Sequence, residues 1–131
     1  MKVLILSDRK DVLASFSRQF SLREEPFEII GIEAQGQTSF SALEALIEEA
    51  QASVLVVALM PAITAEAHYF AHCHALIKSF KNTAIKLQLP LLFVSNTAVF
   101  DGERIVYQEA DQVCPASDFG RWYVEQEQLL A

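Results

Sequence analysis

Two histidines on the longest predicted helical stretch of this 131-residue chain have the residue type and spacing of metal ligands. His68 and His72 are four residues apart, so their imidazoles would lie on one face of a helix and could share a metal ion. The neighbouring Cys73 and His74 point to other sides of such a helix, and the sequence supplies no obvious carboxylate or other third ligand beside the pair. Because a zinc site needs at least three protein ligands, we predict no metal site here.

Asp8 follows the first apolar run of the chain. The receiver domain of a response regulator begins in a similar way, but it needs an acidic pair after its first strand and a phosphorylatable aspartate after its third. Here Asp8 stands alone, and the third apolar run ends in Ala58, Leu59 and Met60. The sequence therefore argues against a phosphorylated receiver. We expect Asp8 to cap the following helix, because its carboxylate can accept a hydrogen bond from a first-turn N–H.

A nucleotide phosphate is the next candidate ligand, because the loop after the first apolar run opens a helix. Dinucleotide-binding loops carry glycines here, which let the backbone approach the pyrophosphate. Residues 7–13 contain no glycine, and Asp8 and Asp11 would repel a diphosphate. Glu33, in contrast, ends the second apolar run, where an acidic residue would meet a ribose hydroxyl. The candidate cofactor-binding residues are Ser7, Lys10 and Glu33.

The two cysteines, Cys73 and Cys114, do not form the kind of framework that secreted disulfide-rich domains use. Neither belongs to a histidine–acid pattern in the sequence that would activate it as a nucleophile. We expect Cys73 to be a small apolar packing residue and Cys114 to be a reduced thiol in a loop.

Short apolar runs alternate with amphipathic stretches along the whole chain. The runs at residues 3–6, 27–32, 54–59 and 91–95 predict strands that are buried on both faces, as in a parallel sheet. Helical spacing predicts helices after Asp8, from residue 41, over residues 64–86, and from Asp118, which can cap the last one. This alternation predicts a three-layer α/β/α sandwich with a mostly parallel sheet of four to five strands, as one domain over residues 1–131. The pattern leaves a flavodoxin-like and a Rossmann-like strand order open.

The composition excludes several kinds of partner. Apolar residues make up 52% of the chain and charged residues 21%, which is typical of a folded domain. The net charge of −7 disfavours nucleic acid and anionic membranes, because binding phosphates requires clustered lysine and arginine. No apolar run approaches the roughly 18 residues of a membrane span, and the N-terminal MKVLILSDRK is not a signal peptide. We therefore expect a soluble cytoplasmic protein.

The last third of the chain carries a series of motifs in a fixed order. Residues 95–102 read SNTAVFDG after the fourth apolar run, and residues 119–123 read FGRWY at the start of the last predicted helix. Between them stand Tyr107, Glu109, Asp111 and Pro115. This order resembles the extended short-chain dehydrogenases/reductases, and most of all their dTDP-4-dehydrorhamnose reductase branch. The resemblance implies a Rossmann-like, NAD(P)-binding-like domain.

The positions that carry catalysis in that family are substituted here. The family uses a tyrosine as the proton donor or acceptor, a lysine one turn later that lowers the pKa of this tyrosine, and a serine or threonine hydroxyl. These positions fall on Phe119, Tyr123 and Asn96. The glycines of the phosphate loop fall on Ser7, Lys10 and Leu13. The comparison therefore implies no catalytic residues and no bound cofactor, although NAD(P) stays possible by resemblance.

The resemblance also implies a shortened relative, because the family continues beyond the catalytic helix into a substrate-binding domain that this chain lacks. We expect a non-catalytic interaction or regulatory module that forms a homo-oligomer or binds another protein, since the fourth strand would be an uncovered sheet edge. One alternative is a protein that still binds a nucleotide or nucleotide sugar, through Glu33, residues 7–10, Asn96 and Tyr123. The other is an NAD(P)-dependent reductase of the dTDP-4-dehydrorhamnose reductase type.

Overall fold

The computed structural model describes residues 2–21, 28–33, 40–62, 64–95, 115 and 117–130. Its contacts divide the chain into two compact units, residues 1–94 and residues 95–131. Each unit is described by itself. The expectation of one domain over the whole chain stays a prediction.

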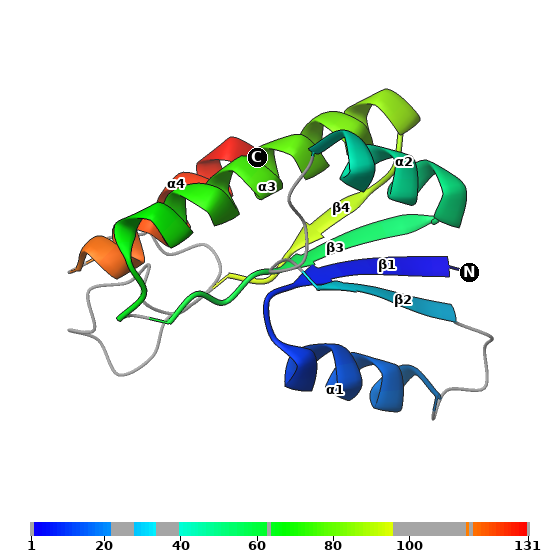
Figure 1. Cartoon of the computed structure of the whole chain (residues 1–131), viewed down its shortest axis with the longest axis horizontal. Coiled ribbons are helices and arrows are strands. Elements are labelled where there is room, and N and C mark those ends of the chain that lie inside the picture. The colour runs from blue at the N-terminus through cyan, green and yellow to red at the C-terminus, as the bar shows by residue number, and fades with distance from the viewer. Residues whose placement is uncertain are drawn as a thin grey trace. The chain divides into compact units, whose positions relative to one another are not determined.

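Four parallel strands form the sheet of the first unit: β1 (Lys2–Ser7), β2 (Glu28–Glu33), β3 (Val54–Ala58) and β4 (Leu91–Phe93). Their order is β2-β1-β3-β4 (Figure 1), so β1 and β3 are the central strands and are covered on both faces. Leu4, Leu6, Leu55 and Val57 are fully buried. These continuously apolar runs suit a parallel sheet, and the predicted fold class is confirmed.

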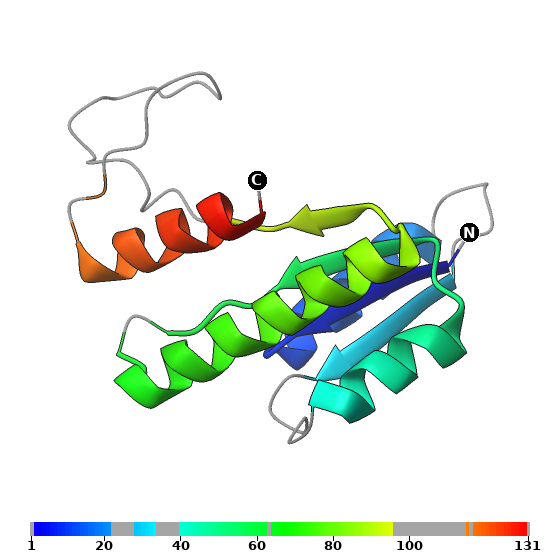
Figure 2. The same ribbon diagram turned by 90° about the horizontal axis from the view of Figure 1, so that it is seen from above.

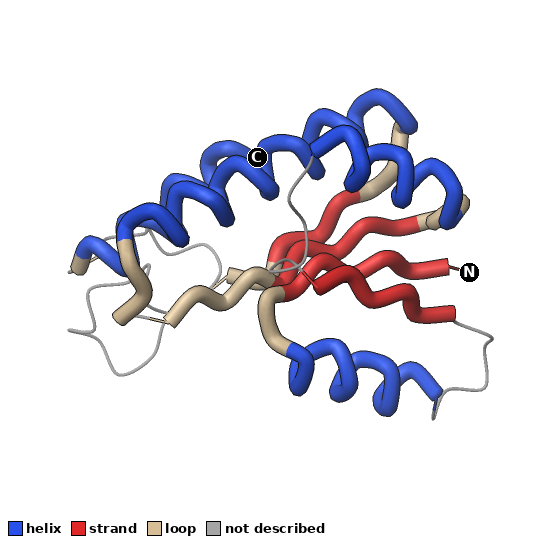
Figure 3. The backbone as a smooth tube through the Cα atoms, viewed as in Figure 1, coloured by secondary structure: helices blue, strands red, loops and turns tan. Residues whose placement is uncertain are grey.

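Helices cover both faces of this sheet and make a three-layer sandwich. Helix α1 (Lys10–Ser21) lies on one face, while α2 (Phe40–Ala50) and α3 (Ala67–Leu87) lie on the other (Figures 1 and 3). Seen from above, α2 and α3 lie side by side over the sheet (Figure 2). Strand and helix alternate along the chain, and each helix therefore connects one parallel strand to the next.

The core has one layer on each side of the sheet. Toward α1, the buried side chains of β1 and β3 pack against partly buried residues of the helix, Val12, Leu13 and Phe16. Toward α2 and α3, the opposite side chains of the same strands face two apolar helix surfaces. The buried residues of those two helices include Leu43, Ile47, Leu76, Ile77 and Phe80.

Helix α3 ends in a left-handed residue that directs the chain into β4. Gln88 has φ 55° and ψ 45°, and the Leu89 N–H donates to the Ala84 carbonyl at 2.9 Å. Pro90 follows, which cannot continue a helix. The Pro90 carbonyl then accepts the Leu55 N–H at 3.0 Å, so the turn sets the register of β4 beside β3. This register places Leu92 opposite Val56, on the α1 side of the sheet.

The second unit contains α4 (Asp118–Leu130). The N-cap is Ser117, whose Oγ accepts the Gly120 N–H at 3.1 Å. The expectation that Asp118 caps this helix is therefore wrong. Asp118 is the first helical residue and forms an ion pair with Arg121 instead, a pairing that its place in the first turn favours.

None of the helices in the described ranges is both long enough and apolar enough to cross a membrane.

Candidate functional site

The carboxyl ends of β1 and β3 are the place where this fold could bind a ligand. In the order β2-β1-β3-β4, the chain moves outward from β1 in one direction and from β3 in the other. In open α/β sheets, ligands bind at the carboxyl edge where the strand order reverses. Two segments meet there, residues 7–10 after β1 and residues 59–62 after β3.

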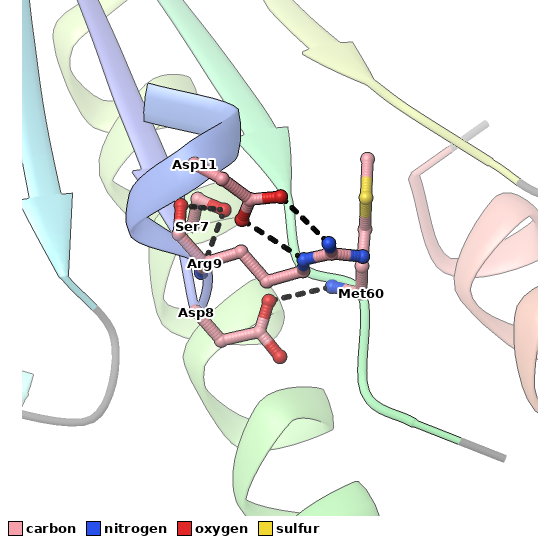
Figure 4. Close-up of polar contacts among 5 residues, drawn as sticks. All are labelled: Ser7, Asp8, Arg9, Asp11 and Met60. Atoms are coloured by element: carbon pink, nitrogen blue, oxygen red, sulfur yellow. Dashed lines mark hydrogen bonds and ion pairs between the residues drawn. The ribbon is translucent and has the colours of Figure 1, made fainter. Parts of the chain in front are cut away.

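Ser7 is fully buried at the end of β1. Its Oγ accepts the Arg9 N–H at 3.2 Å, within the turn that leads into α1 (Figure 4). The Ser7 hydroxyl therefore satisfies one backbone donor that a phosphate at this turn would otherwise use. Ser7 caps the turn, and this is the role that the sequence had suggested for Asp8.

Asp8 connects three segments of the first unit instead of capping α1. Its Oδ1 accepts the Met60 N–H at 2.8 Å, and its Oδ2 accepts the Tyr69 hydroxyl at 2.8 Å. The contact with Met60 is drawn in Figure 4. The carboxylate thus joins the end of β1 to the residue after β3 and to the first turn of α3. The prediction that Asp8 caps the helix is wrong, because these distant donors take both carboxylate oxygens.

Tyr69 responds to this environment. Burial, together with the hydrogen bond to Asp8, raises the pKa of its phenol above the ordinary value. Tyr69 therefore stays protonated and acts as a donor. Sequence reasoning missed Tyr69 and the Met60 N–H, since they lie 61 and 52 residues from Asp8 and no local pattern links them.

The next two charges pair with each other. The Arg9 guanidinium donates to Asp11 at 3.1 and 2.7 Å, and both side chains are exposed (Figure 4). Hydrogen bonding to Asp11 raises the pKa of Arg9, and the same contact lowers the pKa of Asp11. Lys10, the first residue of α1, is exposed.

The sequence resemblance matched Leu13 to the third glycine of the family loop, where a helix must approach the sheet closely. In this chain the glycine is on the sheet: Gly31 of β2 faces Leu13. A Cβ added to Gly31 would lie 3.2 Å from Leu13 Cδ1 and 3.3 Å from Leu13 Cδ2. The large residue on the helix thus meets the small residue on the strand, and close helix–strand packing is preserved.

Glu33 and Ser7 are neighbours, because their Cα atoms are register partners at the ends of β2 and β1. Two of the sequence-predicted cofactor residues are therefore brought to the same sheet edge, and Lys10 follows Ser7 by three residues. The side chain of Glu33 lies outside what the structure describes.

Cys73 is fully buried on α3 beside Tyr69. Burial raises the pKa of its thiol to about 11. Such a thiol carries little thiolate at neutral pH and is a poor nucleophile. The structure therefore places Cys73 where a packing residue was expected. The described residues contain no cluster of three metal-ligating side chains.

Phe119 and Tyr123 lie one turn apart on α4 and are both aromatic. The ring of Tyr123 meets the ring of Phe119 edge-on, with centroids 5.2 Å apart, and the ring of Trp122 with centroids 4.9 Å apart. Tyr123 is 1% exposed. A buried aromatic ring thus stands at the position that the sequence resemblance matched to the family's lysine. Asn96, Cys114 and the motif over residues 96–114 lie outside the described residues.

No model of a known protein family matches the sequence, and no curated protein matches it. Solved structures do match over nearly the whole chain. A dTDP-4-dehydrorhamnose reductase from Clostridium acetobutylicum is 23% identical with a TM-score of 0.73, over 99% of this chain and 49% of that one. A hypothetical dTDP-4-dehydrorhamnose reductase from Sulfolobus tokodaii is 20% identical with a TM-score of 0.78, over 98% and 51%.

A third match is the dTDP-4-dehydrorhamnose reductase of Bacillus anthracis in complex with NADP, which is 14% identical with a TM-score of 0.76. The match covers 98% of this chain and 49% of the Bacillus anthracis protein. The chain therefore has the Rossmann-like fold of the dTDP-4-dehydrorhamnose reductases, which its last third resembles, and it spans about half of their length.

Proposed function

We propose that this chain is a non-catalytic relative of the sugar-nucleotide reductases and acts as a cytoplasmic interaction or regulatory module. The observation that carries the proposal is the position of Asp8. Its carboxylate lies at the sheet edge between β1 and β3, with both oxygens engaged by Met60 and Tyr69. A negative, internally bonded group therefore stands where a dinucleotide fold needs open backbone donors.

Two neighbouring features support the same proposal. The Ser7 hydroxyl already accepts the Arg9 N–H, so this backbone donor is not available to a phosphate. The Asp11 carboxylate at the first turn of α1 engages the Arg9 guanidinium, so this cation is also occupied. Bringing in a diphosphate would require breaking these contacts and placing like charges close together.

The residues of α4 support the loss of catalysis. Phe119 has no hydroxyl with which to move a proton. Tyr123, buried among aromatic rings, has no positive charge with which to lower a neighbour's pKa. The family chemistry needs both functions in adjacent turns, and this helix supplies neither.

Thermal unfolding in the presence of ligands tests the proposal. A ligand at 100 times its Kd stabilises a protein by about 2.7 kcal/mol, which moves the melting temperature by several degrees. We expect NADH, NADPH and dTDP-glucose at millimolar concentration to leave the melting temperature of this chain unchanged. A nucleotide-binding reductase serves as the positive control. A rise with any of the three compounds would overturn the non-binding part of the proposal.

Nucleotide binding is the second candidate, and two observations favour it. Lys10 is exposed at the N-terminus of α1, where a lysine could meet a phosphate, and one of the similar structures holds NADP. If this candidate is correct, the melting temperature rises with NADPH, and Lys10→Ala abolishes that rise. Lys78→Ala, which changes another exposed lysine, on α3, is the matched control and should retain it.

A further inference from the structure

Helix α3 is attached to the sheet in two different ways along its length. From Cys73 onward it is held by apolar burial, and its buried residues are Cys73, Leu76, Ile77, Phe80, Thr83 and Ala84. Residues 67–72, the first two turns, contain no buried side chain. The N-cap residue Glu66 makes no side-chain capping hydrogen bond. The start of the helix is therefore held by half-buried side chains, Tyr69, Phe70 and His72, and its N-cap residue provides no side-chain cap.

A polar contact joins this part of the helix to the sheet. The Tyr69 hydroxyl donates to Asp8 Oδ2 at 2.8 Å, and the Met60 N–H donates to Asp8 Oδ1 at the same distance. Both bonds have a carboxylate acceptor, which makes them stronger than bonds between neutral groups. One side chain after β1 thus holds both the segment that leaves β3 and the turn that begins α3.

We propose that Asp8 is a latch, and that residues 67–72 open as a local unit, hinged before Cys73, when the latch is released. This inference rests on the proposed function, because it describes how access to the same sheet edge is regulated. Segments with few buried apolar contacts open at a lower free energy than the global unfolding of the domain. The remainder of α3 stays packed, since its apolar contacts do not depend on Asp8.

The thiol of Cys73 is a built-in reporter of this opening. It is fully buried, and it lies next to Tyr69 at the hinge. In the closed state the Cys73 thiol is shielded and its pKa is raised to about 11, so it reacts slowly with a disulfide reagent. Opening of residues 67–72 removes the Tyr69 side of its environment and exposes the sulfur.

The experiment measures the rate at which Cys73 reacts with 5,5′-dithiobis(2-nitrobenzoate) in a Cys114→Ser background, so that one thiol gives the signal. Tyr69→Phe keeps the ring and removes only the hydroxyl. We expect it to raise the rate about ten- to a hundredfold, since it removes a hydrogen bond to a carboxylate. Asp11→Asn, which breaks an exposed pair in the same turn, is the matched control and should leave the rate unchanged.

Urea unfolding of the same proteins separates local opening from global unfolding. If Asp8 is a latch, the reaction rate of Cys73 in the Tyr69→Phe variant rises by more than the loss of global stability of that variant accounts for. Low concentrations of urea should then leave this reaction rate unchanged, because local opening exposes little surface. A rate equal to that of the parent, or one that rises only as much as global stability falls, overturns the proposal. A melting temperature that rises with NADPH would overturn the proposed function and leave this comparison of rates intact.

Discussion

The carboxylate of Asp8 joins three segments of the chain at the carboxyl edge of the sheet. Its two oxygens bond to Met60 and Tyr69, which approach from β3 and α3. Hydrogen bonds to a charged group contribute about 1.5–3 kcal/mol, and leaving such a group buried without partners costs more. Asp8 is therefore expected to contribute to stability as well as to restrict access to the edge.

The pair Leu13 and Gly31 leads to a packing prediction. A Cβ on Gly31 would already lie 3.2 Å from Leu13 Cδ1, so the Leu13 side chain would have to shift to accommodate it. We expect Gly31→Ile to reduce the free energy of unfolding by about 1–3 kcal/mol through overpacking, as measured by urea denaturation. Adding Leu13→Ala to Gly31→Ile should recover part of the loss. Equal losses in the single and double variants would contradict this packing.

Cys73 leads to a prediction about pH. Its pKa is raised from 9.0 to about 11 by burial, so the unfolded chain loses the thiol proton first as the pH rises. The contribution of this group is complete below pH 9 and is lost between pH 9 and 11. We expect the free energy of unfolding to fall by about 1–3 kcal/mol over this window. In a Cys114→Ser background, Cys73→Ala should make the free energy of unfolding nearly independent of pH between about 9 and 11. An unchanged slope would show that other groups cause the loss of stability.

At the scale of elements, two helices end on a left-handed glutamine. Gln51 after α2 has φ 52°, and Gln88 after α3 has φ 55°. Glycine adopts this conformation without the steric cost that a Cβ brings. These two residues lie where α2 and α3 end, shortly before β3 and β4 begin. The connections from α2 to β3 and from α3 to β4 therefore use a backbone conformation that glutamine disfavours.

Gln88→Gly is therefore predicted to stabilise the protein. We expect the free energy of unfolding to rise by about 0.4–1 kcal/mol, with an additional rise from Gln51→Gly because the two turns are distant. Gln19→Gly, at an exposed position within α1, is the control and should cost about 1 kcal/mol. Urea denaturation of the three variants checks the result. A loss of stability for Gln88→Gly would show that its side chain matters more than its backbone conformation.

At the scale of the whole molecule, the large apolar residues that are exposed among the described residues are Ile85 and Leu92. Leu92 is 58% exposed and lies on β4, the last strand in the order of the sheet. Exposed apolar side chains at an edge strand favour association, and residues 87–95 carry no charge that would oppose it. These features agree with the proposed interaction module.

We therefore predict that the chain self-associates in a concentration-dependent way. Light scattering coupled to gel filtration should show a mass above that of the monomer at high concentration, and Leu92→Lys should shift it toward the monomer. Lys78→Glu, which changes an exposed charge on α3, is the control and should have no effect. A strict monomer at all concentrations would contradict this prediction and leave a different protein as the partner.

Much of the fold could be predicted from local patterns. Continuous apolar runs marked β1 and β3, because a strand covered on both faces has no polar side to show. The spacing of Leu76, Ile77 and Phe80 marked the buried side of α3 for a similar reason. Helix caps were predicted less well: Ser7 and Ser117 cap the turns that Asp8 and Asp118 were expected to cap, since neighbouring polar residues are equivalent in a sequence pattern.

The sequence by itself determined the class of the fold, because this follows from residue types at known spacings. It left the strand order open, and it did not reveal what Asp8 binds. Only the tertiary structure decided these points, since the partners of Asp8 are 52 and 61 residues away and meet it only where β1, β3 and α3 converge. Contacts between distant residues depend on the packing of whole elements, and no local pattern contains that information.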